Sequence, residues 1–91
     1  MEINELKPII EGVLFATGDA VAVDKLAEIT ESDRDDIQKA AEELASDYEA
    51  EDRGIMLTRV EDKLQLCTKT ELYPYLMKIA KNKREYQLTE Y

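Results

Sequence analysis

The segment from residue 32 to residue 51, SDRDDIQKAAEELASDYEAE, constrains the fold more than any other part of the sequence. Its apolar residues recur at intervals of three or four, which places them on one face of an α-helix. They are Ile37, Ala40, Ala41, Leu44, Ala45 and Tyr48. We expect Ser32 to cap this helix by accepting a hydrogen bond from the N–H of Asp35, and the aspartates of the first turn to complement the helix dipole. The pattern predicts a long helix that buries one face and exposes a charged one.

Two helices are predicted before this segment. The first begins near Asn4 and ends near Ala16, with a wide apolar face. That face comprises Leu6, Ile9, Ile10, Val13, Leu14 and Ala16. Gly18 and the aspartate after it supply a turn, because both residue types tolerate left-handed backbone. A short helix from 23 to 29 follows, with Leu26 and Ile29 facing inward.

A β-hairpin is predicted after the long helix, which Gly54 closes in the left-handed conformation. Residues 55–60 (IMLTRV) and 63–68 (KLQLCT) alternate in the manner of strands with one covered face. The covered residues are Ile55, Leu57, Leu64 and Leu66. Residues 61–63 form the connecting turn.

A last helix is predicted from about Thr70 to Ala80, and Pro74 is tolerable because it lies in the first turn. Its main apolar stripe, expected to face the core, is Leu72, Tyr75, Leu76 and Ile79. Helix, short helix, helix and hairpin in this order predict an α+β winged helix-turn-helix fold. It has a three-helix core, a two-stranded wing and an additional C-terminal helix.

The charge distribution argues against a role in reading DNA. The chain has 21 acidic and 12 basic residues; residues 1–62 carry 18 and 6 of them, a net −12, and residues 63–91 carry 3 and 6, a net +3. In a winged helix the long helix would read DNA, and DNA readers depend on lysine and arginine to neutralise phosphates. The outer face here has four acids and one base: Asp35, Gln38, Lys39, Glu42, Glu43, Ser46 and Glu49.

Catalytic and metal chemistry find little support in the composition. The chain has no histidine and a single cysteine, Cys67, which rules out the usual nucleophile–histidine triads and any multi-cysteine zinc site. We therefore expect no catalytic, cofactor-binding or metal-binding residues, and Cys67 as a small buried residue of a strand. No apolar run reaches the ~18–20 residues of a membrane span, and no signal peptide is evident, so a cytoplasmic location is expected.

Some apolar residues lie off the main stripes of their helices. Pro8, Gly12 and Phe15 share one side of the first helix, and Tyr73, Met77 and Ala80 share one side of the last. They are either additional core or a two-fold dimer or partner interface, where aromatic residues and methionine are enriched. A basic cluster comprises Lys78, Lys81, Lys83 and Arg84. It is either a solvated helix end and linker, or a patch that docks an acidic partner or makes weak phosphate contacts.

Three strings together resemble a known family. IIEGVLFATGDAV (9–21), KLAEI (25–29) and GIMLTRVEDKLQLCTKTELYPYLMKI (54–79) are similar to the N-terminal winged-helix domain of segregation and condensation protein B (ScpB), a subunit of the bacterial condensin. The chain departs from the family pattern at Ala22, where serine or threonine is common. It also departs at Asp62 and Lys63, which replace a glycine-rich wing tip, and at Thr70, which replaces a proline.

The resemblance implies a non-enzymatic subunit that acts in chromosome condensation and segregation. Proteins of this kind form homodimers through their N-terminal domains and bind the kleisin ScpA, which connects them to the SMC ATPase in the cytoplasm at the nucleoid. Family members continue into a second winged-helix domain, to which much of the kleisin contact is attributed. We therefore expect residues 1–80 to be a dimerisation domain, and 81–91 a linker or the start of a second domain that the chain lacks. The alternative is a winged-helix DNA-binding transcription regulator.

Overall fold

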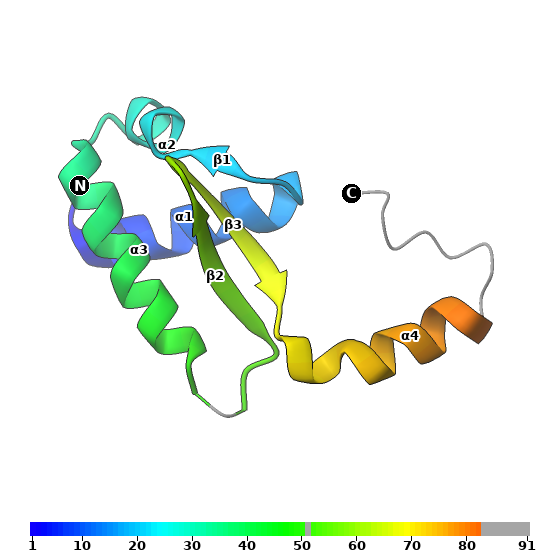
Figure 1. The fold of residues 1–91 in the computed structure, drawn as a ribbon. Coiled ribbons are helices and arrows are strands. Elements are labelled where there is room, and N and C mark those ends of the chain that lie inside the picture. The colour runs from blue at the N-terminus through cyan, green and yellow to red at the C-terminus, as the bar shows by residue number, and fades with distance from the viewer. Residues whose placement is uncertain (51, 83–91) are drawn as a thin grey trace.

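A computed structural model of the protein describes residues 1–50 and 52–82, with side chains up to residue 79. Its elements follow the order expected of a winged helix (Figure 1). They are α1 (Ile3–Thr17), β1 (Val21–Ala22), α2 (Val23–Thr30), α3 (Arg34–Tyr48), β2 (Ile55–Val60), β3 (Lys63–Thr68), the 3₁₀ turn η1 (Thr70–Leu72) and α4 (Tyr73–Asn82). The predicted fold class is therefore confirmed.

The core lies where α1, α2, α3 and the hairpin meet. Its buried residues are Leu6, Ile10, Leu14, Val23, Leu26, Ile37, Ala40, Ala41, Leu44, Tyr48 and Leu64. The stripe predicted for α3 is thus confirmed, with Ala45 half-buried at its margin. The prediction is wrong for Ala16 and Ile29, which are exposed. On α2 the inward position belongs to Thr30, whose hydroxyl donates to the carbonyl of Leu26 at 2.7 Å and so needs no water.

The helix ends differ in detail from the sequence-based expectation. Glu2, rather than Asn4, precedes the first turn of α1, and its N–H donates to the Glu5 carboxylate at 2.9 Å. Asp33 occupies the N-cap position of α3, while the Ser32 hydroxyl donates backward to the carbonyl of Thr30 at 3.3 Å. Gly18 does end α1 in the left-handed conformation, with φ 68°, as expected.

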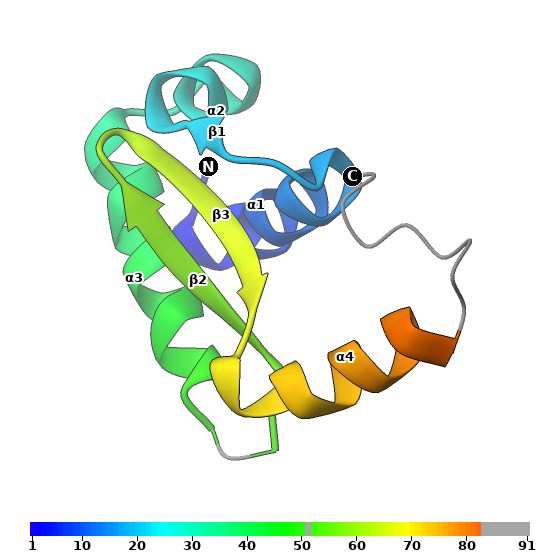
Figure 2. The ribbon, with the colours of Figure 1, turned by 45° about the vertical axis from the view of Figure 1, so that its right-hand side comes forward.

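The sheet has three antiparallel strands in the order β1-β3-β2 (Figure 2). The bounds of β2 and β3 are those predicted, and Leu57 pairs with Leu66 on the covered face. The prediction is wrong for Ile55, which is 36% exposed because it lies at the end of β2 beyond the core. Lys63 belongs to β3 rather than to the turn, because it pairs with Val60, which leaves a two-residue turn of Glu61 and Asp62. The two-residue strand β1 was not predicted; it pairs Val21 with Leu64.

The hairpin turn is held against the start of α2. The N–H of Val23 donates to the Asp62 carbonyl at 2.8 Å, and the Asp62 carboxylate lies 3.6 Å from the guanidinium of Arg34. Arg34 also pairs with Asp24 of α2, and the hydrogen bond to Asp24 raises the pKa of Arg34. The wing tip is therefore docked on the body instead of projecting from it.

The end of α3 is fastened to α1 by a buried tyrosine. The Tyr48 hydroxyl donates to the Glu11 carboxylate at 2.5 Å, and Arg53 lies 5.7 Å from the centre of the Tyr48 ring. Burial, followed by the hydrogen bond to Glu11, raises the pKa of Tyr48 above its ordinary value of 10.0. Deprotonation of Tyr48 is therefore opposed in the folded state.

The free energy of unfolding should consequently fall as the pH rises above about 10. In that range Tyr48 keeps its proton in the folded protein and has lost it in the unfolded chain. The free energy of unfolding therefore falls by up to about 1.4 kcal/mol per pH unit. Urea unfolding of the wild type and Tyr48→Phe, measured from pH 8 to about pH 11, isolates this contribution from that of the lysines. The wild-type curve should fall more steeply; parallel curves would contradict the assignment.

Candidate interaction surfaces

Hydrogen bonds from Lys69, shortly before α4, attach this end of the chain to the winged-helix body. The Lys69 N–H donates to the carbonyl of Gly54 at 3.0 Å, and the Lys69 ammonium donates to the carbonyl of Ala50 at 2.9 Å. Gly54 is not left-handed, contrary to expectation; Gly18 is the glycine with positive φ in the described chain. A Cβ on Gly54 would lie 3.0 Å from Cδ1 of Leu72, so glycine here permits the close approach of η1.

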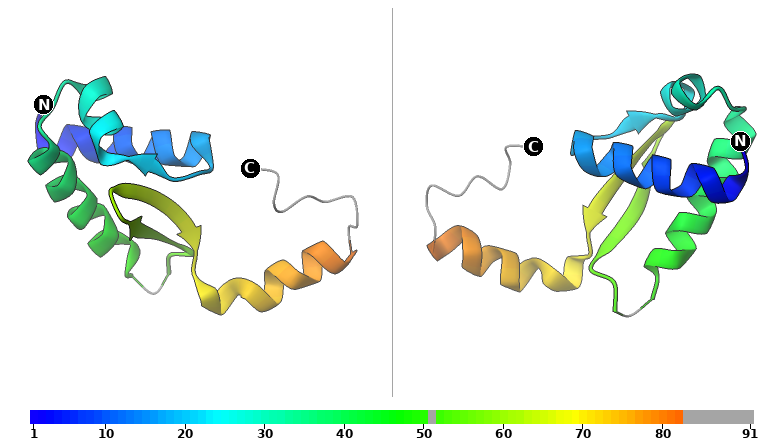
Figure 3. Two further views of the ribbon diagram at one scale, coloured as in Figure 1. Left: turned by 45° about the horizontal axis from the view of Figure 1, so that its top comes forward. Right: turned by 180° about the vertical axis from the view of Figure 1, so that it is seen from behind.

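Beyond this attachment α4 extends away from the body and contacts mainly η1 (Figures 1 and 3). Tyr75 and Ile79 of the stripe expected in the core are 64% and 43% exposed, so that prediction is wrong. Tyr73 and Met77 of the second stripe are 54% and 65% exposed. The helix leaves the body at the far end of the hairpin, so neither stripe reaches the core. A helix that exposes large apolar side chains among the described residues is typical of an interaction element.

The second apolar surface lies on α1. Pro8, Gly12 and Phe15 are all exposed, and Phe15, at 80%, is the most exposed large apolar side chain among those that the structure describes. A Cβ on Gly12 would meet nothing within 4 Å, so the helix surface beside Phe15 is open. The additional-core interpretation is therefore wrong for these three residues, as it is for Tyr73 and Met77.

Within one chain the structure does not bring the two apolar surfaces together. The α1 surface comprises Pro8, Gly12 and Phe15, and the α4 surface comprises Tyr73, Met77 and Ala80, of which the side chain of Ala80 lies outside the described part. Of the basic cluster, Lys78 is exposed and lies 5.9 Å from the ring centre of Tyr75. Lys83 and Arg84 lie outside the described residues, as does most of the predicted linker 81–91.

The outward side of α3 is acidic, as predicted. Glu42, Glu43 and Glu49 are exposed, and the one lysine of α1 is already paired with this helix. Lys7 lies 2.9 Å from Asp47 and 3.6 Å from Glu43, and the hydrogen bond to Asp47 raises the pKa of Lys7. This face repels phosphate rather than attracting it.

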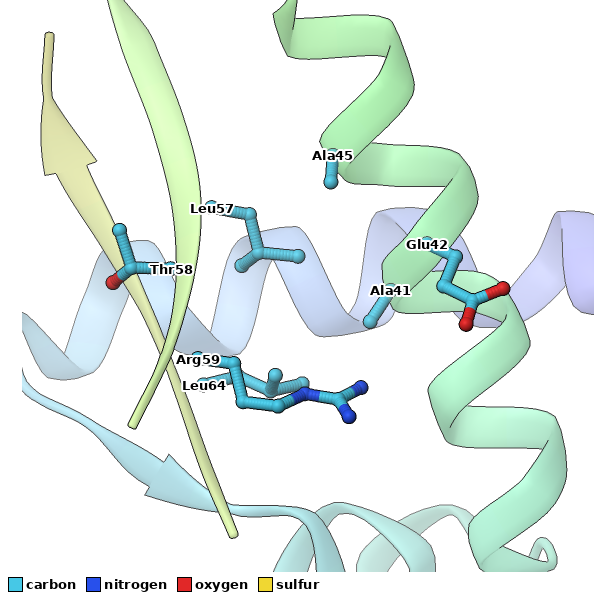
Figure 4. Close-up of a pocket in the computed structure, with 7 residues that line it drawn as sticks. All are labelled: Ala41, Glu42, Ala45, Leu57, Thr58, Arg59 and Leu64. Atoms are coloured by element: carbon cyan, nitrogen blue, oxygen red, sulfur yellow. The ribbon is translucent and has the colours of Figure 1, made fainter. Parts of the chain in front are cut away.

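A groove that the sequence did not predict runs between α3 and β2 (Figure 4). Its volume is about 220 Å³, and its lining is Ala41, Glu42, Ala45, Leu57, Thr58, Arg59 and Leu64. A second hollow of about 420 Å³ shares Ala45 and Leu57 and continues past Glu49 and Met56 to Glu71. The sequence signal, in retrospect, was the pair of alanines four residues apart on α3, which leaves room beside the strand.

Metal binding and membrane spanning find no support among the described residues. Cys67 is half-buried rather than buried, with its Sγ 3.4 Å from the Thr58 hydroxyl. Between residues 1 and 82, residue 51 aside, no three histidine, cysteine or acidic side chains gather in a way that could hold a metal ion. No helix in this part of the chain combines the length and the apolar character needed to cross a membrane.

Comparison with known proteins gives a consistent result. The family described as "Segregation and condensation complex subunit ScpB" matches residues 8–91. Segregation and condensation protein B of Lachnoclostridium phytofermentans is 36% identical over 90 residues, which are 99% of this chain and 48% of that protein. Its counterpart from Oceanobacillus iheyensis is 35% identical over 91 residues, 99% of this chain and 47% of that protein. The chain thus spans about half the length of the curated relatives it matches.

Solved structures agree with the sequence comparison. A dimer of an ScpB N-terminal domain complexed with an ScpA peptide has a TM-score of 0.80 and 35% identity, covering 85% of this chain and 96% of that one. ScpB from Mycobacterium tuberculosis has a TM-score of 0.84 at 24% identity, covering 99% of this chain and 56% of that one, which shows the shared fold.

Proposed function

The chain belongs to the ScpB family of segregation and condensation complex subunits, and on this premise we propose that it is a non-enzymatic adaptor of a bacterial SMC condensin. It forms a homodimer and binds a kleisin of the ScpA type, which links it to the SMC ATPase at the nucleoid. The observation that carries this proposal is α4, whose Tyr73, Tyr75, Met77 and Ile79 are exposed in the part of the chain that the structure describes. The similar N-terminal domain that forms a dimer with a bound ScpA peptide supports it.

The dimer contact follows from the two apolar surfaces. We propose that the α4 surface of one copy packs on the α1 surface of its partner, and the reverse. A two-fold dimer uses such a pair of complementary surfaces twice. Aromatic residues and methionine from α4 can cover the open helix surface at Gly12 and bury Phe15, which removes apolar area from water.

Charge supports this pairing over a contact between like surfaces. The sequence is acidic up to residue 62 and basic beyond it, so α4 with Lys78 is attracted to the body of another copy. Packing α4 on the α4 of the partner would instead bring lysines together. Opposite charges around an interface favour the correct partner and orientation.

Two labelled partners distinguish the adaptor from a DNA-binding regulator. Fluorescence anisotropy at low salt should detect binding of the chain to an ScpA-type kleisin and no binding to a short duplex DNA. The acidic α3 and the docked, acidic wing tip repel the phosphates of DNA. Contacts between basic side chains and phosphates supply most of the non-specific affinity for DNA. Tight, salt-sensitive binding to the duplex without binding to the kleisin would contradict the proposed function.

A further inference from the structure

Strand β2 has a free edge. In the order β1-β3-β2 it is hydrogen-bonded to β3 on one side, and no backbone hydrogen bond from another described segment reaches residues 55–60 on the other side. A free strand edge presents unpaired N–H and C=O groups that an extended backbone can satisfy. Along this edge lies the groove beside α3.

The groove has an apolar floor with room for side chains. Leu57 and Arg59 of β2 point toward α3, and Ala41 and Ala45 line the facing side of the helix, while the Glu42 carboxylate lies on the helix side, turned away from the strands (Figure 4). Its volume of about 220 Å³ is several times the ~30 Å³ that a water molecule occupies in the liquid. Apolar side chains, which alternate to one side of an extended segment, can therefore enter between helix and strand.

The rim on the helix side is acidic. Glu42 lies on α3, Glu49 follows the last residue of α3, and Glu71 lies on η1 at the far end. None of the three forms an ion pair with another described residue. The nearby Lys69 ammonium is already bonded to the Ala50 carbonyl. A segment that carries lysine or arginine therefore complements this rim.

From these observations we infer that the groove binds an extended segment of the ScpA-type kleisin, which adds to the sheet as a fourth strand beside β2. Its apolar side chains enter between Ala41, Ala45 and Leu57, and its basic side chains pair with Glu42 and Glu49. The inference rests on the kleisin association proposed above. A second copy of the chain is a poorer occupant, because pairing two such edges would bring two acidic rims together. None of its lining residues belongs to the α1 or α4 surface, so the proposed dimer contact does not use them.

Substitutions at neighbouring positions of α3 test the groove. Ala45→Arg fills it, whereas Ser46→Arg adds the same side chain one residue later, on the exposed side of the helix. For a central contact of an interface we expect Ala45→Arg to weaken kleisin binding about 30-fold or more and Ser46→Arg less than about 3-fold. Charge reversal at exposed positions, Glu42→Lys with Glu49→Lys, should weaken binding as well and serves if Ala45→Arg does not fold.

Amide hydrogen exchange provides the readout specific to strand addition. Amides of Ile55–Val60 that exchange rapidly in the free chain should become protected when the kleisin is bound. Kleisin binding that is unaffected by all these variants, or that leaves β2 unprotected, would overturn the groove assignment while the proposed function stands. A kleisin that does not bind the wild-type chain would overturn both.

Discussion

Ile10→Ala should lower the free energy of unfolding by about 2–5 kcal/mol, because it deletes buried methyl groups and leaves a cavity that the surrounding helices fill only in part. Ile10 is fully buried in the middle of α1. Domains of this length are stable by only about 5–14 kcal/mol, so the variant should lose a large part of its stability. Urea denaturation followed by circular dichroism measures the change.

Ile29→Ala is the matched control, because it removes the same atoms at a position that is 50% exposed. Its effect should stay within about 1 kcal/mol. Equal losses for the two variants would show that α2 packs with Ile29 inward, as the sequence alone suggested, and would contradict the core described here.

Phe15→Glu or Tyr73→Glu should shift the protein from dimer to monomer while leaving it folded. Each substitution places a carboxylate where the proposed interface buries an aromatic ring. Loss of a central aromatic contact weakens association by about 2 kcal/mol or more, which raises the dimer dissociation constant about 30-fold or more. Both side chains are more than half exposed in the single chain, so its folding should tolerate the change. Light scattering across a concentration series measures the dissociation constant.

Val60→Glu controls for the added charge, since Val60 is 58% exposed and lies at the hairpin tip, outside both apolar surfaces. It should leave the dimer unchanged. A dimer that is insensitive to both Phe15→Glu and Tyr73→Glu, or equally sensitive to Val60→Glu, would count against the proposed contact.

The elements that the sequence predicts best are those whose burial pattern is local. The stripe from Ile37 to Tyr48 and the alternation of 55–60 and 63–68 each report which face is covered, so α3, β2 and β3 lie where expected. The family resemblance extended this to the whole order of elements. Strand β1 escaped prediction because two residues are too few for a pattern and its partner, β3, is about 40 residues away.

The errors have two sources, local hydrogen bonds that an apolar pattern does not show and contacts between distant segments. Thr30 can lie on the core side of α2, where Ile29 was expected, because its hydroxyl donates to the Leu26 carbonyl of the same helix. Glycine at 54 is favoured by the close approach of the Leu72 side chain rather than by a left-handed backbone conformation. The direction in which α4 leaves the hairpin is set by these contacts with η1, and no periodicity within α4 contains that information.

The candidate surfaces likewise divide into features with a local sequence pattern and features that depend on how distant elements pack. Residues that lie off the main stripe of a helix can be read from the sequence, and Phe15, Tyr73 and Met77 are indeed exposed. The sequence also predicted that Tyr75 and Ile79 are buried in the core, because its pattern does not show that α4 extends away from the winged-helix body. The groove between α3 and β2 depends on the spacing of two elements and so had no pattern of its own.

Mixing the two interface variants tests most directly whether α4 of one copy packs on α1 of another. A dimer of Phe15→Glu with itself, or of Tyr73→Glu with itself, has two altered contacts. A mixed dimer keeps one contact between an unaltered α4 and an unaltered α1. Light scattering of an equimolar mixture should therefore show more dimer than either variant alone at the same total concentration. A mixture that associates no better than its components would contradict this pairing.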